Sequence, residues 1–497
     1  MTTPESTAPH ITEGSSGIDP KAMRVIWLLL VAAFVAILNE TTMGIAIPHL
    51  NRDLGLPPEV GQWLTSAFML SMAVVIPTTG FLLQRFTTRQ VFLSAITAFT
   101  IGTLLCLVAP SFPFLLAGRI VQAMGTGVMM PLLMTTMMNV VPPHSRGRMM
   151  GRVGLVISLA PAIGPSLSGA ILDSLSWRWI FAIVLPIALI SLALGAKWMT
   201  NLGETTTARI DILSVILSVL AFGGIVFGLS QFGGGHGGEA ATAQETEGAL
   251  SSTIPIAVIA AGFVFLALFV WRQIALSRKG NPLLDLRVFR SRNFTLAVII
   301  MAVVAMAMFG TLTLLPQYLQ NVVGFTALES GLVLLPGSVL MGVLAPLIGR
   351  IYDAVGPRML LVPGTILVSS VLFFYSTLTP STPVELLVPA QTAMSVGLAM
   401  SFTPLFSSSL GSLPRSLYSH GSAVLNTLQQ VGGAAGVSIL LTTYSSVLHA
   451  GEQRGLDVVA AGAPGARTAF LIAACLSTVP LVLSFFIRKP ADQEDAA

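Results

Sequence analysis

The sequence predicts an all-α polytopic membrane protein with fourteen transmembrane helices, on the evidence of its composition, its apolar segments and the placement of its basic residues. Of 497 residues, 54% are hydrophobic and only 9% are charged, whereas a typical soluble domain is about 25% charged. Fourteen spanning helices of roughly 20 residues take up about 280 residues, just over half of the chain. The composition therefore excludes a soluble enzyme, a disordered scaffold and a nucleic-acid-binding protein.

Short polar breaks separate the apolar segments and set the order of the predicted helices. Residues 1–20 are polar, and we expect them to form a disordered cytoplasmic tail. The first apolar segment is longer than the core of a signal peptide and has no convincing cleavage site, so we expect it to be retained as a helix. The predicted spans are 25–46, 62–82, 90–109, 113–139, 150–172, 179–199, 210–231, 253–276, 294–315, 328–349, 359–378, 385–410, 419–448 and 467–488.

The distribution of lysine and arginine predicts the topology. If the N-terminus is in the cytoplasm, most of the 25 basic residues lie in the even-numbered breaks or near the two ends of the chain. Cytoplasmic loops carry an excess of Lys and Arg, so this pattern predicts fourteen spans in the cell (inner) membrane with both termini cytoplasmic. The odd-numbered, outside breaks hold only Arg52, Arg178, Arg454 and Arg467.

Two longer breaks divide the chain into parts. Residues 232–250 are rich in glycine and contain no Lys or Arg, which is typical of a flexible outside loop, whereas residues 272–292 are basic and suit a cytoplasmic linker. The predicted parts are a six-helix bundle at 21–200, two inserted helices with the Gly-rich loop at 201–278, a second six-helix bundle at 279–490 and a cytoplasmic tail at 491–497.

An internal repeat links the two bundles. GFLLQRFTTR, Gly80–Arg89, follows the second predicted span, and GRIYDAVGPR, Gly349–Arg358, follows the tenth. Where the second copy has Asp353 and Gly356, the first has Gln84 and Thr87. Duplicated bundles are common in transporters, which place the substrate site between the halves near the bilayer midplane.

Four segments resemble motifs of the major facilitator superfamily, specifically its 14-helix drug:proton antiporter branch. They are the loop motif in its two copies, the Arg-x-x-Gln motif in the fourth span, the sequence APAIGPSLSG in the fifth, and LNETTMGIAIP in the first. In the first-span motif Asn39 holds the usual place of the acid, and Glu40 carries the charge one residue later. The other matching residues are Gly80, Arg85 and Arg89; Gly349, Asp353, Gly356 and Arg358; Arg119 and Gln122; and Gly164, Pro165 and Gly169.

This resemblance implies a major-facilitator fold and a function in multidrug efflux and antibiotic resistance. Members of the branch export hydrophobic or cationic drugs in exchange for protons, by alternating access between the two bundles. The loop and fifth-span motifs are then gating and structural elements. The expected partners are a small-molecule substrate, protons and the lipid bilayer, with no nucleic acid, no cofactor beyond the proton gradient, and a monomeric chain.

Two charged residues inside the spans are the candidates for proton coupling. Glu40 is the only carboxylate deep within a predicted span, and Arg119 is the only basic residue there. A charge at mid-membrane costs at least ~2.5–3.5 kcal/mol, so such residues usually face a cavity and carry function. A desolvated carboxylate can exchange a proton near neutral pH, while Arg119 keeps its charge. The alternatives are a structural acid and an arginine that binds backbone carbonyls, and direct contact between the two is left open.

Polar side chains within apolar sequence are candidates for the substrate cavity. We expect Asn39, Gln122, Gln317, Asn426 and Gln430 to line it, although amides in a membrane also bond to neighbouring helices. In the fifth span, Gly164-Pro165 predicts a bend, and small residues that include Gly154 and Gly169 predict close helix packing.

The absence of enzyme motifs limits the function classes. No lysine follows a glycine, so the sequence has no P-loop, and no nucleophile elbow, metalloprotease motif or metal-ligand spacing is present. The energy for transport must therefore come from an ion gradient. Beside multidrug export, the sequence leaves open a transporter dedicated to one metabolite or lipid-like molecule, and a channel or non-transporting membrane receptor.

Overall fold

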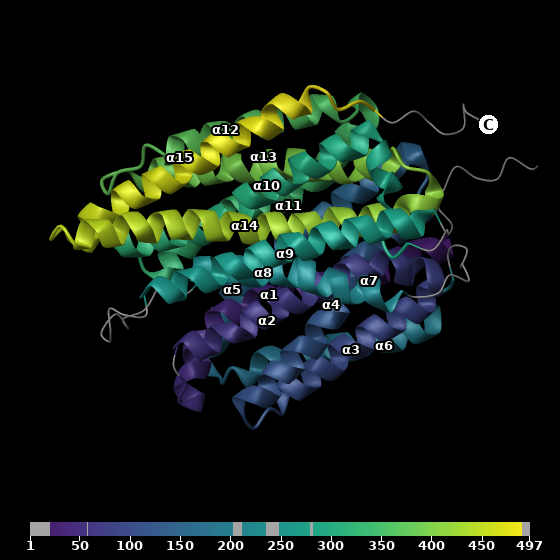
Figure 1. Cartoon of the computed structure of the whole chain (residues 1–497), viewed down its shortest axis with the longest axis horizontal. Coiled ribbons are helices and arrows are strands. Elements are labelled where there is room, and N and C mark those ends of the chain that lie inside the picture. Colours follow the sequence, from purple (N-terminus) through teal and green to yellow (C-terminus); the bar gives the residue numbers. More distant parts are fainter. Residues whose placement is uncertain (1–19, 57, 202–210, 235–247, 279–281, 490–497) are drawn as a thin grey trace, which may run out of the picture.

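The computed structural model describes residues 20–56, 58–201, 211–234, 248–278 and 282–489. The predicted tails lie almost wholly outside these residues, and so does most of the predicted Gly-rich loop. The described part of the chain contains helices and turns and no strand, and the long helices run side by side (Figure 1). The predicted all-α class is thereby confirmed.

The helices follow the predicted apolar segments in order. The first part contains α1 (Pro20–Leu54), α2 (Pro58–Arg85), α3 (Thr88–Leu107), α4 (Phe112–Val140), η1 (Pro143–Ser145), α5 (Arg146–Ser174) and α6 (Arg178–Trp198). Next come α7 (Ile212–Ser218), η2 (Val219–Gly223), α8 (Gly224–Gly234) and α9 (Gly248–Ser277), of which the first three form one continuous helical rod. The last part contains η3 (Leu286–Arg290), α10 (Arg292–Tyr318), η4 (Leu319–Val323), α11 (Ala327–Val355), α12 (Arg358–Tyr375), α13 (Val384–Gly411), η5 (Arg415–Leu417), α14 (Tyr418–Glu452) and α15 (Val458–Ser484).

Every predicted span falls on one of these helical rods. Among the described residues, thirteen helices are long and apolar enough to cross a membrane. The remaining predicted span, 150–172, lies in α5, which has 29 residues and carries three arginines among its first seven. The count of fourteen therefore stays a prediction.

The last span begins earlier than predicted. α15 starts at Val458, nine residues before the predicted boundary at 467, because the Asp457 side chain accepts a hydrogen bond from the Ala460 amide and caps the helix. Arg467 consequently lies inside the helix, and its guanidinium donates to the Leu378 carbonyl. The prediction that placed Arg467 in an outside loop is wrong.

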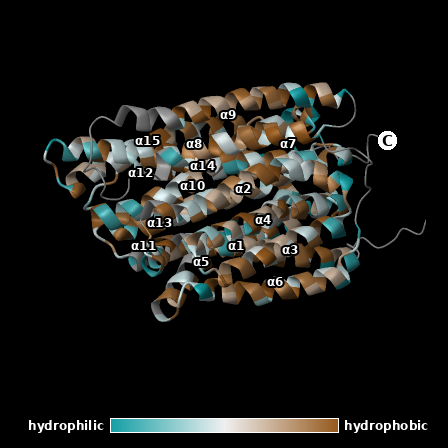
Figure 2. Cartoon of the chain, turned by 60° about the horizontal axis from the view of Figure 1, so that its bottom comes forward, coloured by the Kyte–Doolittle hydropathy of each residue, from teal (hydrophilic) through white to brown (hydrophobic). Residues whose placement is uncertain are grey.

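The polarity of the surface agrees with a membrane-spanning body. Hydrophobic residues dominate the middle of the helices, and hydrophilic residues gather toward both ends (Figure 2). Large apolar side chains face outward, among them Trp271 and Val343, which are 69% and 66% exposed. Large exposed apolar surfaces mark contact with a membrane or a protein partner, and a surface that is apolar around the middle of the helices suits lipid.

Glycines bring neighbouring helices into backbone contact within each bundle. Gly102 of α3 lies against the backbone of Gln122 in α4, and Gly125 lies against the Ala95 carbonyl. In the second bundle, Gly432 and Gly436 of α14 lie against backbone carbonyls of α10. Small residues at helix crossings allow this approach in a membrane. α4 and α14 are therefore held rigidly in their own bundles.

The two bundles meet along two seams on the side where the chain's C-terminus lies, at the right of Figure 1. In one seam α5 packs along α11, with Gly147 against Gly349 and Gly151 against Ala345. In the other, α2 packs along α14, with Gly80 against His420. We call this side the terminal face.

The inserted helices cover the second seam. α8 packs along α14 of the second bundle, while η2 and α8 also contact α2 of the first. Gly223 lies near Leu70 of α2, and the rings of Trp63 and Phe227 lie 5.8 Å apart. The hairpin of α7–α9 therefore touches both bundles.

Candidate functional site

Arg119 is the centre of a buried polar cluster formed by three helices. Its guanidinium Nη1 donates to Asn39 Oδ1 of α1 at 2.9 Å and to Gln122 Oε1 of α4 at 2.7 Å. Gln122 Nε2 in turn donates to Thr103 Oγ1 of α3 at 2.7 Å. Arg119, Gln122 and Asn39 are all at most 1% exposed. The chain of hydrogen bonds therefore orients the buried cation without a carboxylate.

An aromatic ring from a fourth helix completes the cluster. The guanidinium carbon of Arg119 lies 4.0 Å from the ring centroid of Phe68 in α2. Such a contact stabilises a cation by about 2 kcal/mol when water is excluded. The sequence did not single out Phe68, because an isolated aromatic residue in an apolar helix carries no signal of what it faces.

Two donors of the cluster have no partner. Arg119 Nε and Asn39 Nδ2 are buried and make no hydrogen bond within the described part of the chain. Unsatisfied buried donors are rare, because each costs about 1–3 kcal/mol. Both are thus free to bind an acceptor group, which is a property of a binding site more than of a purely structural cluster.

Glu40 follows Asn39 directly but does not pair with Arg119. The ion pairs in the described residues are Asp211–Arg272 and Asp285–Arg287, and neither involves Glu40. The side chain is half-buried in α1. The sequence leaves open whether Glu40 contacts Arg119. Among the described residues, Asn39 accepts the hydrogen bond from the guanidinium, and the Glu40 carboxylate forms no ion pair with it.

The fifth-helix motif packs beside Glu40. Gly164 lies against the Thr41 side chain, where any Cβ would collide. Ser168 Oγ, four residues along α5, donates to the Thr42 carbonyl at 2.9 Å. α1 is therefore held by α4 at Asn39 and by α5 at the next turn.

The sequence predicts close helix packing at two further glycines of α5, Gly154 and Gly169. Nothing lies within 4 Å of the position that a Cβ would take at Gly169, so the prediction of close packing at this residue is wrong. Gly154, by contrast, does contact Ala345 of α11. The side chain of Pro165 lies outside the described residues, and the bend at Gly164-Pro165 stays a prediction.

The amides predicted to line the cavity in the second bundle are not part of the Arg119 cluster. Asn426 is buried, and its Nδ2 donates to the Ser422 carbonyl of its own helix at 2.8 Å. Gln317 and Gln430 are half-buried on α10 and α14. No hydrogen bond among the described residues joins these three to Arg119, so their role in a cavity stays a prediction.

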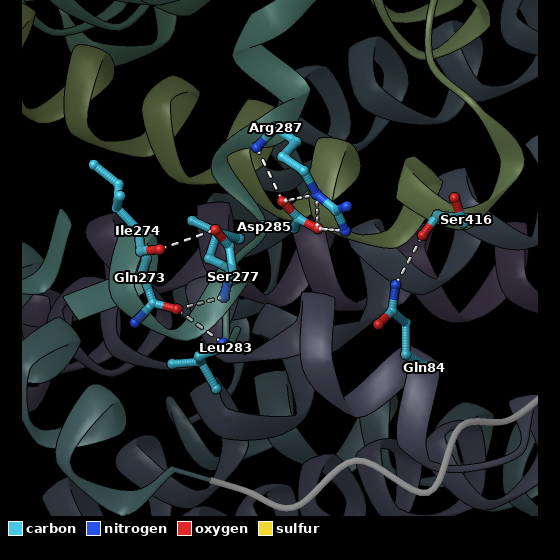
Figure 3. A network of polar contacts seen from close by, with 9 residues as sticks. Gln84, Gln273, Ile274, Ser277, Leu283, Asp285, Arg287 and Ser416 are labelled. Carbon is cyan, nitrogen blue, oxygen red and sulfur yellow. Dashed lines mark hydrogen bonds and ion pairs between the residues drawn. The ribbon is translucent and has the colours of Figure 1, made fainter. Parts of the chain in front are cut away.

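The two loop motifs lie at the two seams of the terminal face. In the first, Gln84 Nε2 donates to the Ser416 carbonyl before α14 at 2.8 Å (Figure 3). In the second, Asp353 accepts hydrogen bonds from the amides of Gly147 and Arg148 at 2.7 and 2.9 Å. Each motif therefore binds the opposite bundle.

The other residues of these motifs, three arginines and Gly356, make no hydrogen bond to the opposite bundle within the described part of the chain. Arg89 donates to the Ala196 carbonyl of α6 at 2.7 Å, within its own bundle. Arg85 is exposed beside Phe86. Gly356 ends α11 with a φ of 81°, a left-handed backbone conformation that favours glycine. Arg358 begins α12 and lies near the Phe485 ring of α15.

A second polar network, missed by the sequence interpretation, fixes the inserted helices. Gln273 of α9 is fully buried, and its Nε2 donates to Ser214 Oγ of α7 at 2.8 Å. Its Oε1 accepts from the amide of Leu283 (Figure 3) and from that of Leu284. A lone Gln near the end of an apolar run was the only sequence signal for it.

Two ion pairs flank this network. Arg272 binds Asp211, the cap of α7, through two hydrogen bonds of 2.7 and 2.8 Å, and these bonds lower the pKa of Asp211 to about 2. Burial raises the pKa of Asp285, but hydrogen bonds from Arg287 outweigh it and hold that pKa below its usual value. Neither carboxylate is free to carry protons near neutral pH.

The site holds one cation, one separate carboxylate and several amides. Among the described residues, no group of three or more His, Cys, Asp or Glu side chains is placed to hold a metal ion. Such a constellation can bind a polar or charged group and exchange one proton.

Comparison with known proteins finds a family model and relatives that agree with each other. A family model described as Major Facilitator Superfamily matches residues 29–437. The chain is 41% identical over 476 residues to the uncharacterized MFS-type transporter YcnB of Bacillus subtilis (strain 168), covering 95% of this chain and 97% of that protein. It is 39% identical over 479 residues to the lincomycin resistance protein LmrB of the same strain, covering 94% and 96%.

A more distant relative and two solved structures extend the pattern. The probable multidrug resistance protein EmrY of Escherichia coli (strain K12) is 29% identical over 419 residues, covering 84% of this chain and 79% of that protein. The E. coli fucose:proton symporter FucP matches with a TM-score of 0.61 at 13% identity, covering 94% and 100% of the two chains. The human organic anion transporter MFSD10 gives 0.60 at 15% identity, with the same coverage. At such low identity these structures show a shared fold alone.

Proposed function

The chain belongs to the Major Facilitator Superfamily and is a multi-span membrane transporter, and we propose that it exports small amphiphilic or cationic compounds from the cytoplasm in exchange for protons. The names of its relatives, which include lincomycin resistance and multidrug resistance proteins, support drug export. The proposal places both termini in the cytoplasm, as the positive-inside rule predicts.

The observation that carries the proton coupling is the separation of Glu40 from Arg119. Because Asn39 and Gln122 already hold the guanidinium, Glu40 can gain or lose its proton without breaking an ion pair. A carboxylate in that position changes the local charge by one unit each time it titrates. In the protonated state the net charge of the region is positive, which disfavours a cationic substrate.

The proposed cycle follows from this change of charge. A cationic substrate enters from the cytoplasm and favours the ionised form of Glu40, so the proton is released inside. After the bundles rearrange, a proton from outside neutralises Glu40. The positive charge of Arg119 is then no longer balanced, and it repels the cationic substrate. The buried donors Asn39 Nδ2 and Arg119 Nε are available for polar groups of the substrate.

Transport in everted vesicles or proteoliposomes tests the proposal. With an imposed pH gradient, the wild-type protein should accumulate a cationic dye and lincomycin, and uncoupler should abolish this. Glu40→Gln should lose gradient-driven transport, whereas Glu40→Asp should retain part of it. The matched control is Glu385→Gln, which removes an exposed carboxylate at the start of α13. Gradient-driven export by Glu40→Gln at the wild-type rate would show that coupling lies elsewhere.

The same preparation separates the other function classes. A panel of substrates that yields a single transported compound would identify a dedicated metabolite transporter. A flux that does not saturate and ignores uncoupler would identify a channel. Saturable export of several amphiphiles is the result expected here.

A further inference from the structure

A basic recess opens on the terminal face of the second bundle, far along the chain from the Arg119 cluster. It has a volume of about 550 Å³ and lies between the first turns of α10 and α12, the end of α13 and the residues that follow α15. The side chains that matter for the inference are Arg292, Asn293, Arg358, Phe485, Arg488 and Lys489.

The recess is built from ordered contacts. Asn293 Nδ2 donates to the Arg488 carbonyl at 2.6 Å, and the Arg488 amide donates back to Asn293 Oδ1 at 3.0 Å. This reciprocal pair joins the start of α10 to the residues after α15. Gly356, with its positive φ, lies against the Lys489 side chain. The spacing between the basic residues is therefore set by the backbone.

The recess concentrates positive charge without compensation. Four of its lining residues, Arg292, Arg358, Arg488 and Lys489, are basic, and none of the lining residues is acidic. Within the described ranges, both ion pairs lie elsewhere. Four like charges around one hollow repel each other, and an anion placed among them relieves that repulsion.

The surroundings of the recess are apolar. Phe485 and Phe486 line it and are 45% and 51% exposed, and Met359, next to Arg358, is 66% exposed. Arg358 lies 5.8 Å from the centroid of the Phe485 ring. Guanidinium and ammonium groups next to exposed apolar side chains suit the boundary between lipid headgroups and acyl chains.

We propose that this recess binds the phosphate of an anionic phospholipid in the cytoplasmic leaflet, with the acyl chains lying against Phe485 and Phe486. The arginines suit phosphate because their planar guanidinium groups can donate two parallel hydrogen bonds. Inorganic phosphate offers the same headgroup chemistry, but it makes no use of the apolar rim. The inference rests on the topology of the proposed function and not on proton coupling.

Binding of defined lipids to the purified full-length protein tests the proposal. Native mass spectrometry in detergent, with phosphatidylglycerol or phosphatidylcholine added, measures binding without any transport. Wild-type protein should bind phosphatidylglycerol more tightly. Each basic residue near an anionic lipid contributes about a factor of five, so Arg358→Gln with Lys489→Gln should weaken that binding about 25-fold. Phosphatidylcholine binding should not change.

Controls separate this recess from general charge effects and from other anions. Arg454→Gln removes an exposed basic residue in the turn that follows α14, and this variant should bind phosphatidylglycerol as the wild type does. Equal affinity for both lipids, or an unchanged affinity in the double variant, would overturn the proposal. So would displacement of the lipid by millimolar inorganic phosphate, which would identify the free anion as the ligand.

The chain's own acidic tail is the remaining competitor. Asp492, Glu494 and Asp495 follow the recess in sequence. A chain that ends at residue 490 should bind phosphatidylglycerol like the full-length chain. If only the truncated chain bound the lipid, the tail would be the occupant and the lipid proposal would fail.

Discussion

The turns after α2 and α11 occupy equivalent places in the two bundles, yet they hold the opposite bundle by different chemistry. After α2, the neutral amide of Gln84 donates a hydrogen bond to the Ser416 carbonyl. After α11, the carboxylate of Asp353 accepts two hydrogen bonds from the amides of Gly147 and Arg148 at the start of α5. A carboxylate at a helix N-terminus also gains from the helix dipole.

The two copies of a duplicated motif can therefore differ in how strongly they bind the opposite bundle. Hydrogen bonds to charged groups contribute about 1.5–3 kcal/mol, and neutral ones about 0.5–1.5 kcal/mol. We therefore expect the α5–α11 seam to hold the terminal face together more tightly than the α2–α14 seam. Two experiments can break or sharpen this contrast, and a third measures a junction outside both seams for comparison.

The largest effect is expected from Gly349→Val. A Cβ at Gly349 would collide with the Gly147 carbonyl, a backbone atom that cannot move away alone, and overpacking of this kind costs about 1–3 kcal/mol or more. The α5–α11 seam should then open. Spin labels at the exposed His144 and Arg350 should report longer distances by double electron–electron resonance.

The matched variant for that experiment is Gly80→Val, at the other seam. There the nearest atom to a Cβ is Nδ1 of the His420 side chain, which has more freedom to adjust than a backbone carbonyl. It should leave the distance between labels at His144 and Arg350 nearly unchanged. Equal opening by both variants would contradict the contrast between the seams.

An intermediate effect is expected from Asp353→Asn. The neutral amide can still accept one hydrogen bond, but the charge and one acceptor are lost. The amides of Gly147 and Arg148 should exchange with deuterium about tenfold faster, which corresponds to a loss of about 1.4 kcal/mol. Gln84→Ala is the paired variant, and it should leave exchange at these two amides unaltered. Wild-type protection in Asp353→Asn would show that the carboxylate does not hold α5.

The smallest effect is expected at a junction that belongs to neither seam, the Asp211–Arg272 pair of the inserted helices. Because the pKa of Asp211 falls from its usual 3.8 to about 2, its ionised form is stabilised in the folded state. This contribution is complete above about pH 4 and is lost as the pH falls toward 2. For a partly exposed pair it should be below about 1 kcal/mol.

The pH dependence of thermal unfolding measures this contribution. Wild type should lose slightly more stability between pH 4 and 2 than Asp211→Asn does, and the two proteins should unfold with parallel profiles above pH 5. A variant that is as acid-sensitive as the wild type would show that the pair does not stabilise the fold.

The sequence predicted the helices well because lipid offers no hydrogen-bond partners to the backbone. An apolar segment in a membrane therefore satisfies its own amides and carbonyls by forming a helix. The largest boundary error is at α15, where residues 458–466 are rich in Ala and Gly and contain Pro464. The Asp457 cap extends the helix through them. Short-range chemistry decided this boundary, and a search for long apolar segments does not detect it.

The candidate site was predicted only in part. Arg119 and Gln122 are three residues apart, so a helix brings them to one face, and the structure joins them. Whether Asn39 or Glu40 would meet Arg119 depended on the rotation of α1, because adjacent residues on a helix point about 100° apart. The contact with Phe68 depended likewise on the rotation of α2. Neither the composition nor the residue spacing predicts how α1 and α2 are rotated about their own axes.

The inserted hairpin makes the two sides of the molecule unequal toward the bilayer. Since α8 contacts both α2 and α14, and η2 also contacts α2, we expect the hairpin to keep acyl chains from the line where these two helices meet. Any rearrangement that separates α2 from α14 must slide one of them past the hairpin or carry the hairpin with it. The Asp211–Arg272 pair and Gln273 hold the hairpin together and bind it to the linker before α10, so we expect the hairpin to move with the second bundle.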